Sequence, residues 1–514
     1  MKKAFLFVVL LFPFLVQCQT KDILKFGAYP LAVPEQNSLM AKWEKKPVLD
    51  SRLIDDMERD GGWKVTGIGE MSYTQDRTKD GKRSLRFRTS LRDTAFYRLP
   101  RNRSQWNSFI GGSGGSSSVV MNFDAPQDWS AFNRVSFWVC VHPTSMPTYT
   151  LSLGIRNEGT VSNTTTHFIQ DLKPGMWNHV LFEIPHLKRD KVTLFNISQE
   201  LFGHHPEEEG IVTHDFDRLE LQRVVTDQYE GWTVAPEEFS FSHVGYRPGD
   251  SKIAMVGSGA SDNFQLIDQK DNIVFSGPVR VVEHKNGIFH QLNFSDFQKE
   301  GMYSIRCGSL ESNPFPINEN IWLQPVFKAI NFYFCERCGY PVPGIHLECH
   351  KDWQGFRGDE KKIINGGWHD AGDLSQGSWR TAMAAFAMIR NLEVLQDRKD
   401  ATELADKIRS EIAWGLEWLL KTRFGDGFHM SFSVMRIYTD NKVGTIDDVV
   451  SPAQNVPWEN FLTAAVECKA AGMLKKSHPE LAHQANVAAI EDWRLLWLHA
   501  ATGIRQAIRR QTGG

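Results

Sequence analysis

The chain has 514 residues, of which 41% are hydrophobic and 23% are charged. This composition excludes a disordered or collagen-like chain, and the length predicts more than one globular domain. The 58 Lys and Arg residues nearly balance the 61 Asp and Glu residues, which leaves a formal net charge of -3. We therefore exclude a general nucleic-acid-binding function, because that function needs a basic surface.

Residues 1–18 have the pattern of a signal peptide. Two lysines follow the initial methionine, and a mostly apolar run then covers residues 4–16. This run is shorter than the roughly 20 apolar residues of a membrane-spanning helix, and no later segment is long enough either. We expect an exported protein in the periplasm, outside the cell or at the cell envelope. The residues before Cys18 resemble a bacterial lipoprotein signal, except that Gln17 replaces a small residue. A lipid on Cys18, which is the one membrane contact we expect, and ordinary cleavage nearby both stay open.

The next 200 or so residues alternate between apolar and polar side chains in short runs, for example over 135–141 and 180–184. Pro, Gly, Asn and Asp separate these runs, which predicts an all-β sandwich. The layout resembles jelly-roll carbohydrate-binding modules, and this resemblance implies a carbohydrate-binding domain over residues 21–238. Core packing is the alternative explanation for strand tryptophans such as Trp138.

A second set of short alternating runs lies between residues 239 and 319. Pro248, Gly249 and Gly301 mark turns between the runs, as in a second β-sandwich. The opening VGYRPGD and the closing EGMYSI resemble the immunoglobulin-like domain that precedes the catalytic domain of many glycoside hydrolase family 9 enzymes. The resemblance implies an immunoglobulin-like domain over 239–319.

After residue 321 the apolar period changes to about 3.6, which predicts helices. Asp400 with Glu403, and Pro457, are typical of helix starts. We expect the rest of the chain, residues 321–514, to be a separate all-helical domain. The expected apolar faces are Val326, Ile330 and Phe334; Trp379, Met383 and Phe386; and Leu404, Ile408, Ile412, Leu416 and Leu420.

The strongest local motif is residues 366–373, which read GGWHDAGD. Asp370 and Asp373 are three residues apart in a loop flanked by glycines, so both carboxylates can point into one cavity. An isolated pair of this spacing is weak evidence for catalysis, because surface Asp pairs are common and most of them are helix caps. The whole string, however, is similar to the GGWxDAGD signature of glycoside hydrolase family 9, and it follows an immunoglobulin-like segment as in that family.

This resemblance implies an inverting hydrolase of β-linked glucan or a related polysaccharide or oligosaccharide, on an (α/α)6 barrel. Inversion needs a base that activates water and an acid roughly 6.5–9.5 Å away that protonates the leaving oxygen. On this chain the resemblance makes Asp373 the general base, with Asp370 helping to hold the water. We expect substrate contacts from Trp368 and Arg380.

Residues 335–350 combine cysteines with histidines, and thiolate and imidazole are the ligands that zinc prefers. The family resemblance implies a structural zinc site that ties the Asp370 loop to the preceding helix. His346 is the rival ligand, and buried cysteines without a metal are the alternative. No loop has ligand spacing that supports calcium, which stays undetermined. The expected zinc ligands are Cys338, Cys349, His350 and His369.

The chain also departs from the family pattern. Residues 321–514 are about half of what a complete (α/α)6 barrel needs, so the sequence predicts a partial barrel. The catalytic acid, a glutamate near the end of the family's domain, has no counterpart here. Glu459 and the pair Asp447-Asp448 are the nearest candidates, although helix capping or a surface role is more typical of such residues. A non-catalytic glycan-binding remnant is therefore the alternative function, and a polysaccharide lyase is a third, which the DAGD string opposes.

Overall fold

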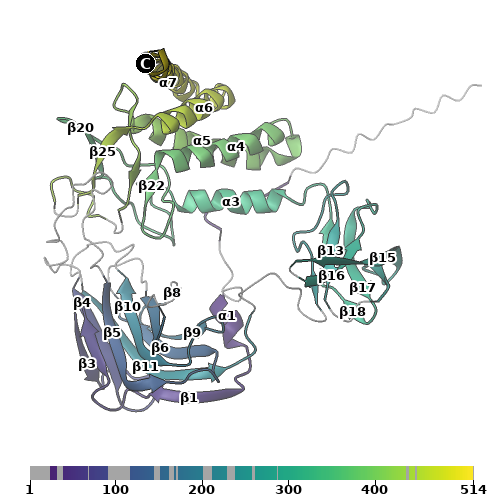
Figure 1. The fold of residues 1–514 in the computed structure, drawn as a ribbon, viewed down its shortest axis with the longest axis vertical. Coiled ribbons are helices and arrows are strands. Elements are labelled where there is room, and N and C mark those ends of the chain that lie inside the picture. The colour runs from purple at the N-terminus through teal and green to yellow at the C-terminus, as the bar shows by residue number, and fades with distance from the viewer. Residues whose placement is uncertain are drawn as a thin grey trace, which may run out of the picture.

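The computed structural model contains two β-sandwich units and a helical unit (Figure 1). The predicted signal peptide, Cys18 and Asp447 lie outside the described residues. Among the residues described, every helix is too short or too polar to span a bilayer. The structure describes residues 24–31, 39–67, 69–90, 116–143, 151–160, 167–169, 172–200, 211–227, 238–257, 261–285, 287–435, 439–445 and 448–512.

The first unit is a sandwich of two antiparallel sheets, preceded by the short helix α1 (Leu39–Glu44). The strand order is β3-β4-β11-β6-β9 in one sheet, with β1 against β11, and β2-β5-β10-β7-β8 in the other. The first sheet comprises β1 (Asp50–Asp55), β3 (Glu70–Thr74), β4 (Ser84–Ser90), β6 (Arg134–Val141), β9 (Trp177–Glu183) and β11 (Ile211–Arg223). The second comprises β2 (Trp63–Thr66), β5 (Ser116–Gln127), β7 (Leu151–Asn157), β8 (His167–Ile169) and β10 (Val192–Glu200).

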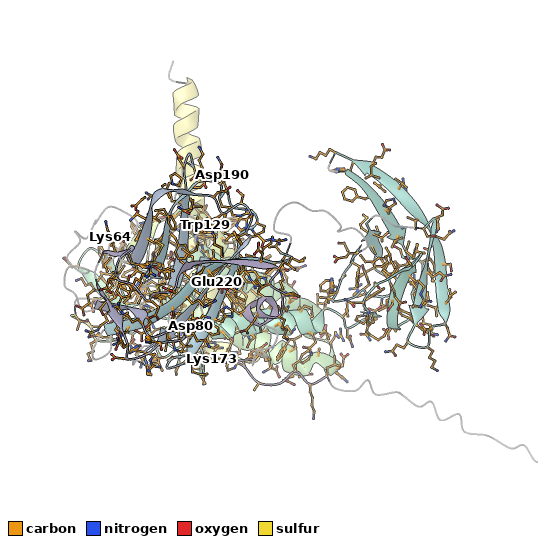
Figure 2. All side chains as sticks on the ribbon, turned by 90° about the horizontal axis from the view of Figure 1, so that it is seen from below. Lys64, Asp80, Trp129, Lys173, Asp190 and Glu220 are labelled. Atoms are coloured by element: carbon orange, nitrogen blue, oxygen red, sulfur yellow. The ribbon has the colours of Figure 1, made fainter. Side chains whose placement is uncertain are left out.

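Aromatic side chains fill the space between these two sheets. Trp129, Phe137, Phe195 and Phe216 are fully buried, and Figure 2 shows Trp129 within this unit. Trp138 does not share this core, because it follows Phe137 on a strand and therefore points to the opposite face of the sheet. The sequence thus predicts the sandwich, but core packing explains only some of its tryptophans.

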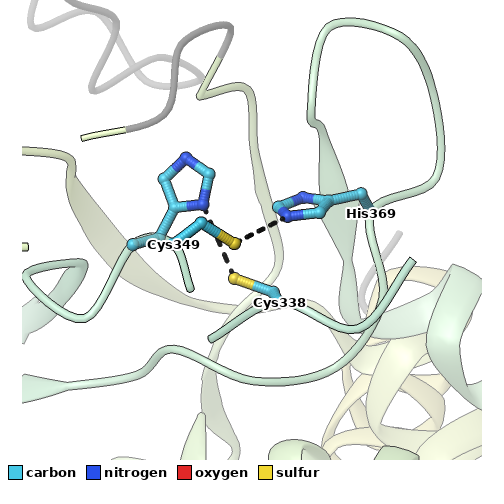
Figure 3. Close-up of side chains that lie close together, drawn as sticks. Cys338, Cys349 and His369 are labelled. Carbon is cyan, nitrogen blue, oxygen red and sulfur yellow. Dashed lines mark hydrogen bonds between the residues drawn. The ribbon is translucent and has the colours of Figure 1, made fainter. Parts of the chain in front are cut away.

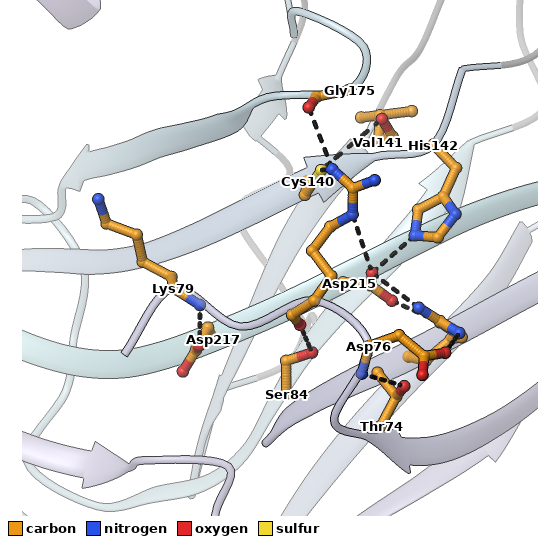
Figure 4. Close-up of polar contacts among 12 residues, drawn as sticks. Thr74, Asp76, Lys79, Ser84, Cys140, Val141, His142, Gly175, Asp215 and Asp217 are labelled. Carbon is orange, nitrogen blue, oxygen red and sulfur yellow. Dashed lines mark hydrogen bonds and ion pairs between the residues drawn. The ribbon is translucent and has the colours of Figure 1, made fainter. Parts of the chain in front are cut away.

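The outer face of the first sheet carries a buried polar cluster instead of an open apolar surface (Figure 4). The Asp215 carboxylate is fully buried and accepts a hydrogen bond of 2.8 Å from Arg86 Nε. His142 Nε2 lies 2.6 Å from the same carboxylate. The backbone N–H of Lys79 donates to Asp217 at 2.7 Å. These bonds tie the segment around Lys79 to the sheet, so that the segment covers part of this face.

The second unit has the two-sheet arrangement of an immunoglobulin-like domain. Its strand order is β12-β13-β16-β15-β14-β17-β18, with β19 against β17. The long strand β15 pairs with β14 through its first half and with β16 through its second half, and so joins the two sheets. The strands are β12 (Phe239–Ser240), β13 (Ile253–Val256), β14 (Asn263–Asp268), β15 (Ile273–His284), β16 (Gly287–Asn293), β17 (Gly301–Cys307), β18 (Leu310–Glu311) and β19 (Phe315–Ile317).

The third unit is mainly helical, but the prediction that it is entirely helical is wrong. A four-stranded sheet of order β21-β20-β25-β23 and a β22-β24 pair lie between the helices. The segments that form them are short and contain turns such as Gly358, which has a positive φ of 59°, so no apolar helical face can develop. The described helices do not confirm an (α/α)6 barrel. They are α3 (Leu323–Cys335), α4 (Ser378–Leu395), α5 (Thr402–Lys421), α6 (Pro457–Leu474) and α7 (Pro479–Thr512), with the 3-10 turn η2 (Lys399–Ala401) before α5. The strands are β20 (Gln354–Arg357), β21 (Glu360–Ile363), β22 (Gln376–Gly377), β23 (Phe428–Met430), β24 (Phe432–Ser433) and β25 (Val450–Asn455).

The predicted apolar face is confirmed on α5 and wrong on α4. On α5, Leu404, Ile408 and Leu416 are fully buried. On α4, Met383 is 55% exposed and Phe386 is 39% exposed. The buried side of α4 consists of Ala382, Ala385, Ile389 and Leu392. Because α4 has apolar residues on both sides, the period alone cannot show which side faces the core.

The segment 24–31 packs on the helical unit, nearly 300 residues away in sequence. The backbone N–H groups of Phe26 and Gly27 each donate to the Glu403 carboxylate at 3.1 Å. The Tyr29 hydroxyl donates to the carbonyl of Phe327 at 2.7 Å, and the two rings stack with centroids 4.9 Å apart. These contacts tie the segment to α3 and to the start of α5, so both sandwich units are inserted between two parts of one folded unit.

A buried charge cluster joins α5, α6 and α7. Arg423 forms ion pairs with Glu467, Glu491 and Asp492, and His429 Nε2 lies 3.3 Å from Asp492. Glu467 and Asp492 are fully buried, and one carboxylate oxygen of each has no hydrogen-bond partner in the described structure. The pKa of Glu467 is raised to about 8, mainly by burial. The positive charge of Arg423 lowers this pKa, and the negative charge of Asp492 raises it further. One guanidinium thus faces more carboxylates than it can neutralise, which favours a proton on Glu467.

We predict that this proton makes the helical unit less stable as the pH rises from about 5 to 8. The pKa of Glu467 is about 8 in the folded state against an ordinary value of 4.5, so the folded chain holds a proton that the unfolded chain has released. The contribution of Glu467 to the free energy of unfolding is complete below the pKa of the unfolded state. It falls by roughly 1.4 kcal/mol per pH unit above that pKa and is lost once the pH passes the pKa of the folded state. Urea unfolding at several pH values would measure the slope for the wild type and for Glu467→Gln. Glu467→Gln should flatten it and the exposed Glu480→Gln should not; an unchanged slope in Glu467→Gln would contradict the assignment.

Candidate active site and metal cluster

The loop that carries the GGWHDAGD motif is fixed between the end of α3 and the side of α5. The N–H of Cys338 donates to the carbonyl of Gly367 at 3.0 Å, and the N–H of His369 donates to that of Glu336 at 2.9 Å. Gly367 has a positive φ of 68°, and a Cβ there would lie 2.7 Å from the Trp418 ring. Only glycine satisfies both the conformation and the close approach to α5.

Trp368 is a core residue, so the prediction that it contacts substrate is wrong. Its side chain is 3% exposed, and its indole N–H donates to Glu411 Oε2 at 3.1 Å. The ring lies so close to α5 that a Cβ on Gly415 would be 2.3 Å from it. No face of the indole is therefore open to a sugar. The prediction failed because the motif does not show which side of the loop faces the core.

The Glu411 carboxylate also accepts from Arg337, whose Nη2 lies 2.6 Å from Oε1. Both side chains are buried, at 9% and 2% exposure. Burial raises the pKa of Glu411, while the charge of Arg337 and hydrogen bonds from Arg337 and Trp368 lower it. Arg337 and Glu411 were not predicted, because a single Arg and a single Glu about 70 residues apart give no sequence signal for a pair.

Asp370 and Asp373 lie in the same loop but have different partners. The Arg380 Nη1 lies 2.6 Å from Asp370 Oδ2, and the Ser375 hydroxyl donates to Asp370 Oδ1. Asp373 Oδ1 accepts only a longer bond of 3.2 Å, from the backbone N–H of Ser375, among its described contacts. Each oxygen of Asp370 thus has a side-chain partner, whereas one oxygen of Asp373 has no described partner and can accept from another group. Ser375 was not predicted, although it lies only two residues after the motif.

The structure places Arg380, predicted as a substrate contact, against Asp370. Its guanidinium lies between two aromatic rings, with the carbon centre 4.9 Å from the centroids of both Trp379 and Phe432. The side chain is 37% exposed. The rings and the ion pair position the guanidinium, so Arg380 helps to fix the place of the Asp370 carboxylate.

The four predicted metal ligands come together in one buried cluster, Cys338, Cys349, His350 and His369. Figure 3 labels Cys338, Cys349 and His369. One ligand atom from each residue lies within 4.8 Å of the others. Cys338 Sγ is 3.7 Å from His350 Nδ1, and Cys349 Sγ is 3.5 Å from His369 Nε2. Two thiols and two imidazoles at this spacing fit the donor set and size of a tetrahedral zinc site.

The pKa values of the two cluster thiols shift in opposite directions. Although burial opposes it, the hydrogen bond from Cys349 and the nearby His369 hold the pKa of the Cys338 thiol well below its usual value. The hydrogen bond to Cys338 and burial raise the pKa of Cys349. The rival ligand His346 is outside the cluster, because its ring nitrogens lie 2.7 Å from the carbonyl of Leu347 and 2.9 Å from that of Cys335.

Neither described candidate for the catalytic acid is exposed. Glu459 is 5% exposed, and its carboxylate accepts from the hydroxyls of Ser378 at 2.8 Å and Ser431 at 2.7 Å. It joins the starts of α4 and α6, which is a structural role and not a surface one. Asp448 is 9% exposed and accepts from the N–H of Gly444 at 2.8 Å, within its own turn.

Comparison with known proteins supports the assignment of the last two units. Endoglucanase C of Cellulomonas fimi is 22% identical over 310 residues, which are 51% of this chain and 28% of that protein. Endoglucanase D of Acetivibrio thermocellus is 25% identical over 281 residues, which are 49% of this chain and 44% of that protein. The chain thus spans less than half the length of these relatives.

Among solved structures, a metagenome-derived glycoside hydrolase family 9 endoglucanase aligns with a TM-score of 0.40 at 21% identity, over 51% of this chain and 54% of that one. Family models give the more specific match. Residues 236–312 match the cellulase N-terminal ig-like domain, and residues 324–510 match glycosyl hydrolase family 9. Residues 324–510 are therefore similar to glycosyl hydrolase family 9, and the unit before them is similar to the N-terminal ig-like domain of cellulases.

Proposed function

We propose that this chain is an exported glycoside hydrolase that cleaves β-linked glucan or a related polysaccharide with inversion. The observation that carries the proposal is the unequal environment of two carboxylates in one loop: Asp370 accepts from two side chains, whereas Asp373 accepts one longer bond from the backbone among its described contacts. The family match and the endoglucanase relatives support this reaction class. The sequence of residues 1–18 supports export.

In this proposal Asp373 is the general base. Its carboxylate accepts a proton from the attacking water, and the oxygen that accepts no described hydrogen bond is the group that can bind the water. Asp370 lies in the same loop, where Arg380 and Ser375 fix the position of its carboxylate, and it helps to hold the water. Inversion also needs an acid for the leaving oxygen. We assign that role to no described residue, since Glu459 and Asp448 are both bound inside the fold.

We also propose that the buried cluster holds zinc. Cys338, Cys349, His350 and His369 would be its ligands, and bound zinc would supply structural cross-linking without contact to substrate. Cys338 follows α3, whereas His369 directly precedes Asp370. The cluster therefore fixes the backbone next to the base loop relative to α3.

The first prediction concerns the base. Asp373→Asn should lower the release of reducing sugar at least about 100-fold, because the amide cannot accept a proton from water. Sugar release would be measured on cellulose, mixed-linkage glucan, xyloglucan and glucomannan. Asp359→Asn, an exposed residue in the β20–β21 turn, is the matched control and should keep full activity. If folded wild-type protein releases sugar from none of them, the alternative function, glycan binding without catalysis, replaces this proposal.

The second prediction concerns the metal. Purified protein should contain about one zinc per chain, measured by inductively coupled plasma mass spectrometry, and Cys349→Ser should lose most of it because one of four ligands is gone. Cys468→Ser is the matched control, since that thiol is exposed on α6. It should keep the metal. Zinc-free wild-type protein, or a Cys349→Ser variant with unchanged zinc, would refute the site.

A further inference from the structure

An exposed apolar face extends over α4, α6 and α7. α6 packs against both of the other helices (Figure 1). Ring contacts continue across the helices: the centroid of Trp458 lies 6.0 Å from that of Trp379 on α4, and the centroid of Phe461 lies 6.0 Å from that of Trp493 on α7. We call this surface the α6 face. Its large side chains are each between 39% and 56% exposed, and they are Met383, Phe386, Trp458, Phe461 and Trp493.

The area of the α6 face equals the apolar part of a homodimer interface. An aromatic side chain offers about 150–250 Å², so four aromatic residues and a methionine that are about half exposed present on the order of 500 Å². A standard interface covers about 800 Å² on each partner, of which about 65% is apolar in homodimers, and this is again on the order of 500 Å². The face is therefore large enough to be the apolar core of a stable dimer interface.

The stripe along the middle of the face has no charged side chain. It follows α6 at helical spacing and consists of Trp458, Phe461, Ala465, Cys468 and Gly472, all of them exposed. The first two side chains are large and the last three are small, and a Cβ on Gly472 would meet no atom within 4 Å. A charged or strongly polar ligand would lose its hydration on this stripe and gain few hydrogen bonds. The stripe suits another apolar protein surface.

The order of large and small residues makes the stripe complementary to itself. Trp458 and Gly472 are each seven residues from Ala465. If two copies of α6 cross antiparallel at Ala465, the Trp458 ring of one copy lies opposite the open space at Gly472 of the other. Phe461, four residues before the centre, lies beside Cys468, three residues after it. Large side chains thus fill gaps between small ones, as in helix pairs that pack ridges into grooves. Two-fold dimers are also the commonest homo-oligomers.

The neighbouring helix α4 fits the same symmetry. It runs parallel to α6, since Trp379 lies beside Trp458 at the two helix starts and Glu393 pairs with Lys469 at 2.9 Å nearer the two ends. The same two-fold axis therefore brings the end of α4 in one copy to the start of α4 in the other. Val394, near that end, is 72% exposed. The second copy would cover this valine together with the α6 stripe.

We propose that the α6 face is the interface of a homodimer in which two copies of α6 cross antiparallel at Ala465. The inference goes beyond the proposed function and does not depend on it. Arg380, in the first turn of α4, pairs with Asp370. The second copy would therefore lie beside the candidate base loop and limit the directions from which a polysaccharide reaches it.

The first test is the mass of the full chain in solution. Sedimentation equilibrium should give about twice the 58.6 kDa of one chain. Phe461→Asp should raise the dimer dissociation constant at least about 100-fold, because the interface would then bury unpaired carboxylates. Trp493→Asp, on the neighbouring helix, should do the same. Phe332→Asp is the matched control, since Phe332 is 52% exposed on α3, outside the α6 face. It should leave the dimer intact, and circular dichroism should show that all three variants are folded.

The second test locates the two-fold axis. Cys468→Ser first removes the exposed thiol of α6. In that background Ala465→Cys should give a disulfide-linked dimer on oxidation, seen on a non-reducing gel, because the two new thiols meet at the axis. Gly472→Cys is the matched control on the same stripe. Its two thiols would be about 21 Å apart along the antiparallel helices, too far for a disulfide, so it should stay unlinked.

Each result supports or overturns the inference. A wild type with the mass of one chain overturns the dimer. A dimer that both Phe461→Asp and Trp493→Asp leave intact uses another surface, which overturns the α6 face. Cross-linking through Gly472→Cys, or none through Ala465→Cys, overturns the antiparallel crossing. A dimer that the two charge variants dissociate and that Ala465→Cys alone links supports the whole inference.

Discussion

The buried ion pair between Arg337 and Glu411 is the interaction on which the site depends. Removing one partner would leave an uncompensated charge in the core, which usually costs about 3–5 kcal/mol. Arg337 directly precedes Cys338, and Trp368, the second donor to Glu411, directly precedes His369. One carboxylate on α5 thus sets the position of a cysteine and a histidine of the metal cluster from both sides. Since Asp370 follows His369, the same carboxylate also sets where the base loop begins.

The two carboxylates of the loop, Asp370 and Asp373, have different hydrogen-bond partners and therefore suit different chemical roles. Asp370 has a guanidinium and a hydroxyl as partners, one on each carboxylate oxygen, and these contacts fix its position. Asp373 has one long backbone bond among its described contacts. Arg380 is essential to this division, and it is itself fixed by Trp379 and Phe432. Arg380, which is predicted to contact substrate, thus contacts the Asp370 carboxylate next to the candidate base Asp373.

The sequence predicts those features that short-range patterns determine. The helical face of α5 and the two β units come from the spacing of apolar residues, and the four cluster residues come from the family resemblance of the motifs that contain them. The sequence could not show which side of α4 is buried or that Trp368 points into the core, because each depends on the neighbour that packs against it. The Arg337–Glu411 pair and the Asp370–Arg380 pair likewise depend on distant or ambiguous partners. Contacts that depend on tertiary packing cannot be predicted from a single sequence. In this molecule they include the hydrogen-bond partners of Asp370 and Asp373.

The segment 24–31 binds to the helical unit, although two sandwich units separate it from that unit in the sequence. It is bound to Glu403 at the start of α5 and to Phe327 on α3, while the carbonyl of Asp400 accepts from Leu24 at 2.9 Å. The same α3 ends next to Cys338, and α5 carries Glu411. The segment therefore holds together the two helices between which the base loop is fixed. Because both sandwich units lie between this segment and α3 in sequence, they are attached to the helical unit at both ends, which restricts how far they can move from it.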